Sequence, residues 1–345
     1  MANLVTVTKD SRIILKLGGI GAGILLLIYI FVQGGVLFKN IFFPKPPEPP
    51  KEALGKLPHI KFPTLGTPGI LFTINTVDGT LPSLPSKVNV YKLVRPEPNL
   101  LALDSAKHTV DSANFIDNQT KLSDTFYQWT QPKSGAIIKY DIVTKNFVIT
   151  SDYLQNPSLA STNLMPGEDS IKSDIGGFLQ TLNAKVTDLD MDKTKIEYLQ
   201  LQGNGLVAAQ NLGMAKYAKV SLIQKSVDEI PIIYDNPNDS QIKFVVSYPG
   251  GSFQILEGEF YNHEPDMEKS SDYPVKTASA ALEDLKNGNA YMINPQNLTS
   301  VDITNVELKY YLNRDSNEFL LPIIVFTGIN FTAYVEALPL SSLSD

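Results

Sequence analysis

The distribution of apolar residues divides the chain into one long hydrophobic run and a longer region of mixed patterning. Residues 17–38 contain no charged side chain and read LGGIGAGILLLIYIFVQGGVLF. At ~1.5 Å per residue, a helix of this length spans roughly 33 Å, which is about the thickness of a bilayer core. The pattern predicts a transmembrane helix over residues 17–38.

The charges beside this run predict the orientation of the chain. The sixteen residues before it contain three basic side chains and one acidic side chain. Basic residues next to a first membrane helix stay in the cytoplasm. We expect residues 1–16 inside the cell and the C-terminal region outside, at the plasma membrane. A cleaved signal peptide shares this pattern, but a hydrophobic run of 22 residues is longer than the usual hydrophobic core of a signal peptide.

Two glycines in the hydrophobic run, Gly19 and Gly23, are four residues apart. This spacing places them on one face of a helix, where the missing side chains let a second helix approach closely. Gly19 and Gly23 are therefore candidates for membrane-helix packing, which would allow a homodimer. Glycine is also frequent in membrane helices that do not pair.

Residues 39–63 form a proline-rich segment. Seven residues between positions 44 and 63 are prolines, and proline is excluded from helix interiors and central strands. The segment is predicted to be an extended stalk, which at ~3.1 Å per residue would reach about 60 Å over twenty residues. Apolar residues at its distal end, such as Ile60 and Phe62, indicate that it docks on the first domain.

Residues 64–160 show the alternating and apolar runs that are typical of strands. The expected strands are ILFTINTV, KVNVYKLV, TFYQWT, AIIKYDIV and NFVITSDY. Thr144, Lys145 and Asn146 separate the last two and predict a hairpin. Residues 112–125 are expected to form a short helix and a loop. We predict a small, mostly antiparallel β domain over 64–160.

Residues 168–345 combine helical and strand patterns, which predicts an α+β fold class with antiparallel sheets. Apolar residues recur at helical spacing from 171 to 182, and a second helix is predicted over TASAALEDLKNG. Thr277 can cap this helix and Gly288 can end it. Similar apolar strings leave open whether residues 168–265 and 270–345 are two related subdomains.

Composition narrows the classes of function. The formal net charge is −7, and residues 1–39 contain four basic side chains against one acidic, so the remainder carries −10. An acidic exterior argues against binding to nucleic acid or anionic lipid. The chain has no cysteine, which excludes disulfides, thiolate metal sites and thiol nucleophiles.

Asp188, Asp190 and Asp192 have the spacing of the first ligands in a calcium loop. Such a loop also needs a glycine and a glutamate, and Lys193 and Leu199 occupy those positions. A solvated acidic turn is the better interpretation.

His263, Glu264 and Asp266 carry the groups of a metal or general-base site. Neighbouring positions point in different directions and no second motif supports the site, so a surface loop is expected. We predict no catalytic, cofactor-binding or metal-binding residue and no cofactor. A serine paired with a distant histidine stays open.

Strand edges and strand aromatics are the remaining candidates for a binding surface. An antiparallel sheet can bind an extended partner at a free edge. Tyr127, Trp129, Tyr310 and Tyr311 could mark a binding face, although aromatics on strands more often pack half-buried.

The C-terminal third, with YPVKTASAALEDLKNGNAYMI, ITNVELKYYLNRDSNEFLLPIIVFTG and FTAYVEAL, resembles the end of the YycH and YycI type of extracytoplasmic regulator. This resemblance covers roughly residues 270–338. It implies one membrane helix, PepSY-like sheets and action on a cell-wall sensor kinase. The whole chain, including GKLPHIKFP, FYQW and NFVITSDY, resembles uncharacterised single-pass proteins of candidate-phyla bacteria, which imply no biochemical role.

Together these features predict a non-enzymatic envelope protein that binds another envelope or membrane protein through a sheet edge, a helix face or the membrane helix. A cell-wall hydrolase or its accessory is a second reading, in which His263 or an unseen serine acts on peptidoglycan or peptides. A passive structural or adhesive protein is the third.

Overall fold

The computed structural model describes residues 49–64, 69–160, 164–293, 299–314 and 318–344. The predicted membrane helix over 17–38, with Gly19 and Gly23, and residues 39–48 of the predicted stalk lie outside these residues. Among the described residues, no helix combines the length and the apolar character needed to cross a membrane.

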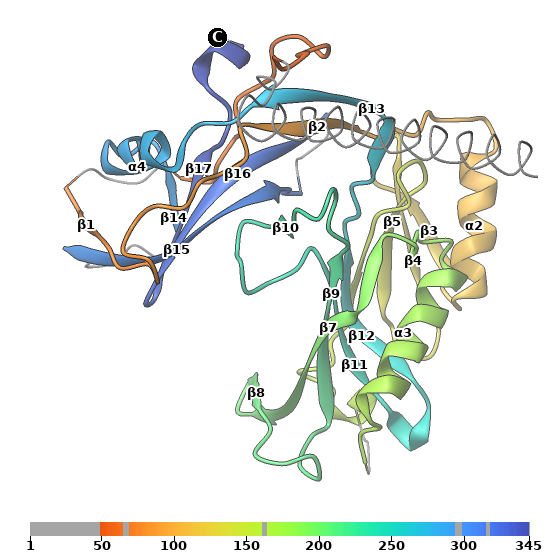
Figure 1. The fold of residues 1–345 in the computed structure, drawn as a ribbon. Coiled ribbons are helices and arrows are strands. Elements are labelled where there is room, and N and C mark those ends of the chain that lie inside the picture. The colour runs from red at the N-terminus through yellow and green to blue at the C-terminus, as the bar shows by residue number, and fades with distance from the viewer. Residues whose placement is uncertain (1–48, 65–68, 161–163, 294–298, 315–317, 345) are drawn as a thin grey trace, which may run out of the picture. The chain divides into compact units, whose positions relative to one another are not determined.

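The described residues form two mostly antiparallel sheets with three α-helices, so the predicted α+β class is confirmed. The helices are α2 (Ala102–Ser112), α3 (Glu168–Thr181) and α4 (Ala278–Lys286). Figure 1 shows α2 and α3 beside one sheet and α4 beside the other.

One sheet has nine strands in the order β3-β4-β5-β6-β12-β11-β9-β7-β8. Its strands come from the middle of the chain: β3 (Asp117–Lys121), β4 (Phe126–Thr130), β5 (Ile137–Asp141), β6 (Phe147–Thr150), β7 (Leu189–Gln202), β8 (Gly205–Ala208), β9 (Tyr217–Gln224), β11 (Ile242–Ser247) and β12 (Gln254–Phe260). Every pairing in this sheet is antiparallel, and most join strands that are close in sequence.

The other sheet has eight strands, with β1-β15-β16-β17-β14 as its main path. The strands come from both ends of the described chain and from one loop: β1 (Leu71–Ile74), β2 (Lys87–Leu93), β10 (Ile232–Ile233), β13 (Pro265–Pro274), β14 (Tyr291–Ile293), β15 (Ser300–Tyr311), β16 (Phe319–Gly328) and β17 (Phe331–Glu336). Both β1 and β10 pair with β15 in parallel.

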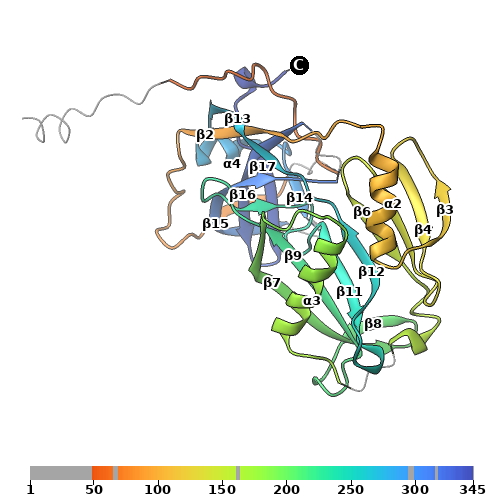
Figure 2. The same ribbon diagram turned by 90° about the vertical axis from the view of Figure 1, so that its right-hand side faces the viewer.

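The core of the nine-stranded sheet lies between the strands and the helices α2 and α3. Ile171, Ile175 and Leu179 recur at four-residue spacing on α3 and are fully buried, as an amphipathic helix on a sheet requires. Figure 2 shows both helices on the same face of this sheet. Phe147 and Phe260 stack at its centre with ring centroids 5.2 Å apart.

The core of the eight-stranded sheet is rich in tyrosine. Tyr310, Tyr334 and Tyr273 have exposed fractions of 0%, and each hydroxyl donates a hydrogen bond to a backbone carbonyl, those of Asn89, Tyr234 and Gly55 respectively. Each carbonyl lies more than 90 residues away in sequence. A buried hydroxyl needs such a partner, so these bonds join distant segments.

The distal end of the predicted stalk docks on the eight-stranded sheet, where Leu57 shares an apolar cluster with β2 of the predicted first domain but also contacts C-terminal elements. Leu57 is fully buried and forms a β-bridge with Leu343. His59 pairs with Glu336 at 2.9 Å, and the Phe62 ring contacts Tyr291 and Tyr311. Local apolar pattern predicted the docking, but it carries no information on the partner.

The predicted boundary between 160 and 168 does not coincide with a division between the sheets. Strands β1 and β2 of segment 64–160 belong to the eight-stranded sheet, whereas β3 to β6 belong to the nine-stranded sheet. In addition, α2 precedes the region 112–125 where a helix was expected, and β3 occupies Asp117–Lys121. The sequence DNQTK of β3 is fully exposed, so it lacks the apolar alternation that would mark a strand.

The loop between β9 and β11 leaves one sheet and joins the other. Its short strand β10 pairs with Tyr310 and Tyr311 of β15. The Tyr311 hydroxyl also contacts Asp235, and Gln224 on β9 accepts a hydrogen bond from Tyr234 at 3.1 Å. Residues 231–233 and 322–324 share the apolar sequence PII, but the first lies in a connection between the sheets and the second lies within β16. This difference does not decide whether 168–265 and 270–345 are related.

Candidate functional site

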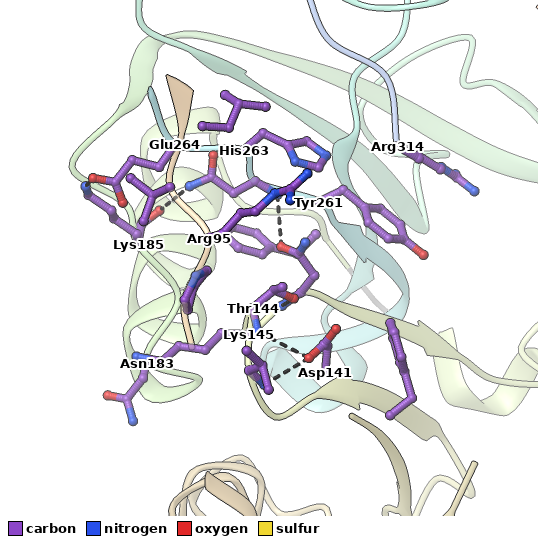
Figure 3. A pocket seen from close by; sticks show the side chains of 18 residues that line it. Arg95, Asp141, Thr144, Lys145, Asn183, Lys185, Tyr261, His263, Glu264 and Arg314 are labelled. Carbon is purple, nitrogen blue, oxygen red and sulfur yellow. Dashed lines mark hydrogen bonds and ion pairs between the residues drawn. The ribbon is translucent and has the colours of Figure 1, made fainter. Parts of the chain in front are cut away.

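A cleft of about 710 Å³ is the candidate site. It is lined by segments that leave strands or helices: residues 93–96 after β2, the β5–β6 turn, residues 183 and 185 after α3, residues 260–264 between β12 and β13, and Arg314 after β15. The volume lies within the usual range for ligand sites, roughly 300–1,000 Å³. Figure 3 shows its side chains in close view.

The β5–β6 turn supplies Asp141, Thr144 and Lys145. Asp141 Oδ1 accepts hydrogen bonds from the backbone N–H groups of Val143 at 2.9 Å and Thr144 at 3.2 Å, which is the usual way in which aspartate stabilises a turn. Lys145 follows in the left-handed region with φ +63°. The carboxylate therefore shapes the turn, and the turn presents the exposed lysine (Figure 3).

A second wall contains Lys185, Asn262, His263 and Glu264. The Lys185 ammonium forms an ion pair with Glu264, while the Asn262 N–H donates to Asn146 Oδ1 at 3.1 Å. The carbonyl of His263 accepts a hydrogen bond from Gln224 Nε2 at 3.1 Å. These bonds fix residues 262–264 against both the β5–β6 turn and β9.

Arg314 and Tyr261 form a third part of the lining. The guanidinium carbon lies 5.0 Å from the centroid of the Tyr261 ring, within the range of a cation–π interaction. The same guanidinium forms an ion pair with Glu259. Burial raises the pKa of Tyr261 above its ordinary value, and the charge of Arg314 partly opposes this rise. Tyr261 therefore stays a neutral hydroxyl at physiological pH.

The lining carries an excess of positive charge. It includes four Lys or Arg side chains, Arg95, Lys145, Lys185 and Arg314, against the carboxylates of Asp141 and Glu264. The chain as a whole carries −7. A locally basic cleft on an acidic protein attracts anionic groups, because field lines concentrate in a concave site with low-dielectric walls.

Two smaller cavities adjoin the cleft. One of about 240 Å³ shares Pro96, Val143, Lys145 and Asn183 with it. The other, of about 350 Å³, shares residues 93–95. The three cavities therefore follow one another along the chain segment that leaves β2.

The residues of the weak calcium pattern do not meet as ligands. Asp190 pairs with Lys193 at 3.1 Å, and this contact lowers the pKa of Asp190. Asp188 is half-buried beside Gln224, and desolvation raises its pKa, whereas Asp192 is exposed. Among the described residues, no group of three or more His, Cys, Asp or Glu side chains is placed to hold a metal.

His263, Glu264 and Asp266, the candidate metal or general-base residues, do not form one site in the structure. His263 and Glu264 line the cleft, whereas Asp266 lines the 350 Å³ cavity. Asp266 pairs with Lys269 at 2.9 Å, which lowers the pKa of Asp266.

The aromatic candidates are mostly packing residues. Trp129, Tyr310 and Tyr311 have exposed fractions of 1%, 0% and 3%. Tyr127 is half-buried and packs against the core of the nine-stranded sheet. None of them lines the cleft.

The four cleft cations were missed by sequence reasoning. Arg95, Lys145, Lys185 and Arg314 are far apart in the chain and share no spacing. The only local signal was the turn at Lys145, which predicted a hairpin but no function.

No protein-family model matches the sequence. No curated protein matches it either. Among solved structures, the fold is similar to the C-terminal domain of Bacillus megaterium YpeB, with 14% sequence identity and a TM-score of 0.31. The match covers 72% of this chain and 96% of the YpeB domain. At this level of similarity it carries no argument about function.

Proposed function

We propose that this chain is a membrane-anchored, extracytoplasmic protein of the cell envelope that binds another envelope or membrane protein and regulates it without catalysing a reaction. The proposal includes a single membrane helix over 17–38 with the N-terminus inside, and a C-terminal PepSY-like region of the YycH and YycI type. The basic cleft on an otherwise acidic protein is the observation that carries it.

The state of the cleft carboxylates supports binding over catalysis. Asp141 directs an oxygen to the backbone of its own turn, and Glu264 is paired with Lys185. A general base needs a lone pair directed at the substrate. Both acids instead neutralise or orient protein groups, as in a rigid recognition surface.

The cleft is a better candidate than an edge of the nine-stranded sheet. The edge strand β3 has five exposed residues with the sequence DNQTK and an irregular register between Asp117 and Thr120. Charged residues and bulges at an edge oppose the addition of another strand.

The test is photo-crosslinking in living cells with the full-length chain. A photoreactive amino acid replaces Thr144, an exposed residue that lines the cleft. The matched control replaces Thr120, an exposed residue on the β3 edge. Capture of one sensor kinase, transporter or other membrane protein through position 144 alone is expected. Capture of only the same chain, or of wall fragments, would contradict the proposal.

The cell-wall hydrolase or accessory is the second candidate, because His263 lines the cleft. In that case His263→Ala abolishes release of soluble fragments from peptidoglycan. Under the binding proposal, the wild-type protein releases none and the substitution changes nothing in this assay.

A further inference from the structure

The cleft presents one ammonium group that is not engaged by the fold. Lys145 has no ion-pair or hydrogen-bond partner for its side chain among the described residues, and it is exposed. Its neighbour Asp141 is turned toward the backbone of residues 143 and 144. Lys145 can therefore bind an incoming carboxylate without first giving up another partner.

The backbone position of Lys145 adds a second observation. With a φ of +63°, Lys145 takes the left-handed conformation that closes the turn, and its N–H donates to the carbonyl of Asp141 at 2.8 Å. The side chain supplies the cleft with a positive charge at a point fixed by the β5–β6 hairpin.

Arg314 supplies further N–H donors on another wall, whereas the Lys185 ammonium is already paired with Glu264. A guanidinium has five N–H donors in a plane, and the pair with Glu259 occupies part of this set. Stacking on Tyr261 holds the plane of the group. The arrangement suits bidentate binding of a planar carboxylate.

The dimensions favour an extended ligand over a single small anion. The two adjoining cavities share residues 93–95 and Pro96, Val143 and Lys145 with the cleft, so binding groups are distributed along one path. Apolar residues, including Val94, Val143 and Phe260, lie among the cations. An extended peptide presents both charged and apolar side chains to such a lining.

We infer that the cleft recognises an extended acidic peptide segment of a partner protein, with Lys145 binding a carboxylate at the turn and the remaining N–H donors of Arg314 binding another. This inference rests on the proposed function and names the chemistry of the bound partner.

The test measures binding of a labelled peptide to the full-length chain in non-ionic detergent. The probe is a rhodamine-labelled ten-residue peptide of alternating glutamate and valine, followed by fluorescence anisotropy. A peptide of alternating glutamine and valine is the neutral control. We expect the acidic peptide to bind at least about tenfold more tightly, and added salt to weaken it.

Two pairs of variants make the test specific. Lys145→Glu is expected to raise the dissociation constant roughly tenfold, whereas Lys133→Glu leaves it within about twofold. Lys133 is an exposed lysine in the β4–β5 turn, outside the cleft, so it changes net charge equally. Lys145→Gly removes the ammonium at a backbone position that glycine favours, so we expect the turn to keep its conformation and the affinity to fall several-fold through loss of the charge alone.

Three results would overturn the inference. They are equal binding of the acidic and neutral peptides, equal weakening by Lys145→Glu and Lys133→Glu, and displacement of the peptide by equimolar inorganic phosphate. If the acidic peptide fails to bind while position 144 still captures one protein in cells, this inference is wrong and the proposed function stands. Failure of both experiments would overturn both.

Discussion

The two sheets have cores of different chemistry. The nine-stranded sheet is centred on phenylalanine: Phe147 packs against Phe260, Phe244 and Phe178 with centroid distances of 5.2 to 6.3 Å. The eight-stranded sheet instead buries tyrosines whose hydroxyls bond to backbone carbonyls of remote segments.

This difference follows from where the strands originate. Strands joined by short turns can be held by apolar burial, because the turns already limit their arrangement. The eight-stranded sheet gathers segment 50–63, β2 and the β9–β11 loop from distant parts of the chain. The hydrogen bonds from the buried tyrosine hydroxyls hold these segments in one position and one register, because each bond requires a particular carbonyl at a particular place. The Tyr91 hydroxyl likewise joins β2 to the β9–β11 loop by donating a hydrogen bond to Asp228. Burial and this bond raise the pKa of Tyr91 to about 12.

The largest expected effect is in the phenylalanine core. Phe147→Ala removes a ring with an exposed fraction of 1% that contacts four aromatic neighbours. We expect a loss of about 3–5 kcal/mol in the free energy of unfolding, measured by chemical denaturation. Phe147→Leu keeps most of the volume and should cost under about 1.5 kcal/mol. Equal losses for the two would show that the core does not depend on ring packing.

A glycine in the eight-stranded sheet gives the next largest effect. A Cβ at Gly328 would lie 2.3 Å from the backbone oxygen of Asp302, so Gly328→Ala forces β15 and β16 apart. We expect a loss of about 2–3 kcal/mol. Gly176→Ala on α3 is the control, because a Cβ there meets nothing within 4 Å and alanine should stabilise the helix by roughly 0.5–1 kcal/mol. Similar thermal shifts for both variants would contradict the register of β15 and β16.

The role of the tyrosine hydroxyls is tested by Tyr334→Phe. This change leaves the carbonyl of Tyr234 without its donor at 3.0 Å, and we expect a loss of about 1–2 kcal/mol. Hydrogen exchange should accelerate in the β9–β11 loop around β10. Tyr140→Phe, whose hydroxyl bonds to Leu182 at 3.2 Å within the other core, should not change exchange at β10. If hydrogen exchange at β10 is unchanged in both variants, the tyrosine hydroxyls do not hold the distant segments in place.

The smallest effects concern two aspartates with opposite pKa shifts. Burial raises the pKa of Asp188. Ionised Asp188 therefore destabilises the folded state at pH values above the ordinary pKa of a carboxyl group. Its Oδ1 is buried without a hydrogen-bond partner among the described residues. Asp188→Asn should therefore be more stable than wild type at pH 7 by roughly 1 kcal/mol, and this gain should vanish as the pH falls below about 4.

Asp272 provides the comparison with opposite sign. The Lys87 ammonium at 2.8 Å lowers the pKa of Asp272, so its stabilising contribution is present above the usual carboxyl range and is lost as the pH falls through the lowered pKa. Asp272→Asn should be less stable than wild type at pH 7 by under about 1 kcal/mol. Melting temperatures at pH 7 and pH 3 decide both cases. A gain for Asp272→Asn at pH 7 would contradict the ion pair.

Much of the local structure could be predicted from sequence. The β5–β6 hairpin forms at the predicted turn, and the predicted cap of α4 is confirmed, since the Thr277 side chain accepts a hydrogen bond from the Ala280 N–H. Gly288 takes the left-handed conformation with φ +82°. In each case, residues close in sequence determine the outcome.

The sheet assignments and the site could not be predicted in this way. The parallel pairing of β1 with β15 joins residues more than 200 positions apart, and no local pattern specifies it. The cleft likewise depends on Lys145, Lys185 and Arg314, which the fold brings to one cavity. A single sequence shows each of them only as an ordinary surface charge.

The central proposal is that the cleft binds a partner protein through its positive charge. The most direct measurement is partner capture through a photoreactive residue at position 144 in cells, compared between chains that carry Lys145→Glu and Lys133→Glu. We expect one captured protein, strongly reduced by Lys145→Glu and unchanged by Lys133→Glu. Equal capture in the two variants, or no captured protein in either, would contradict the proposal.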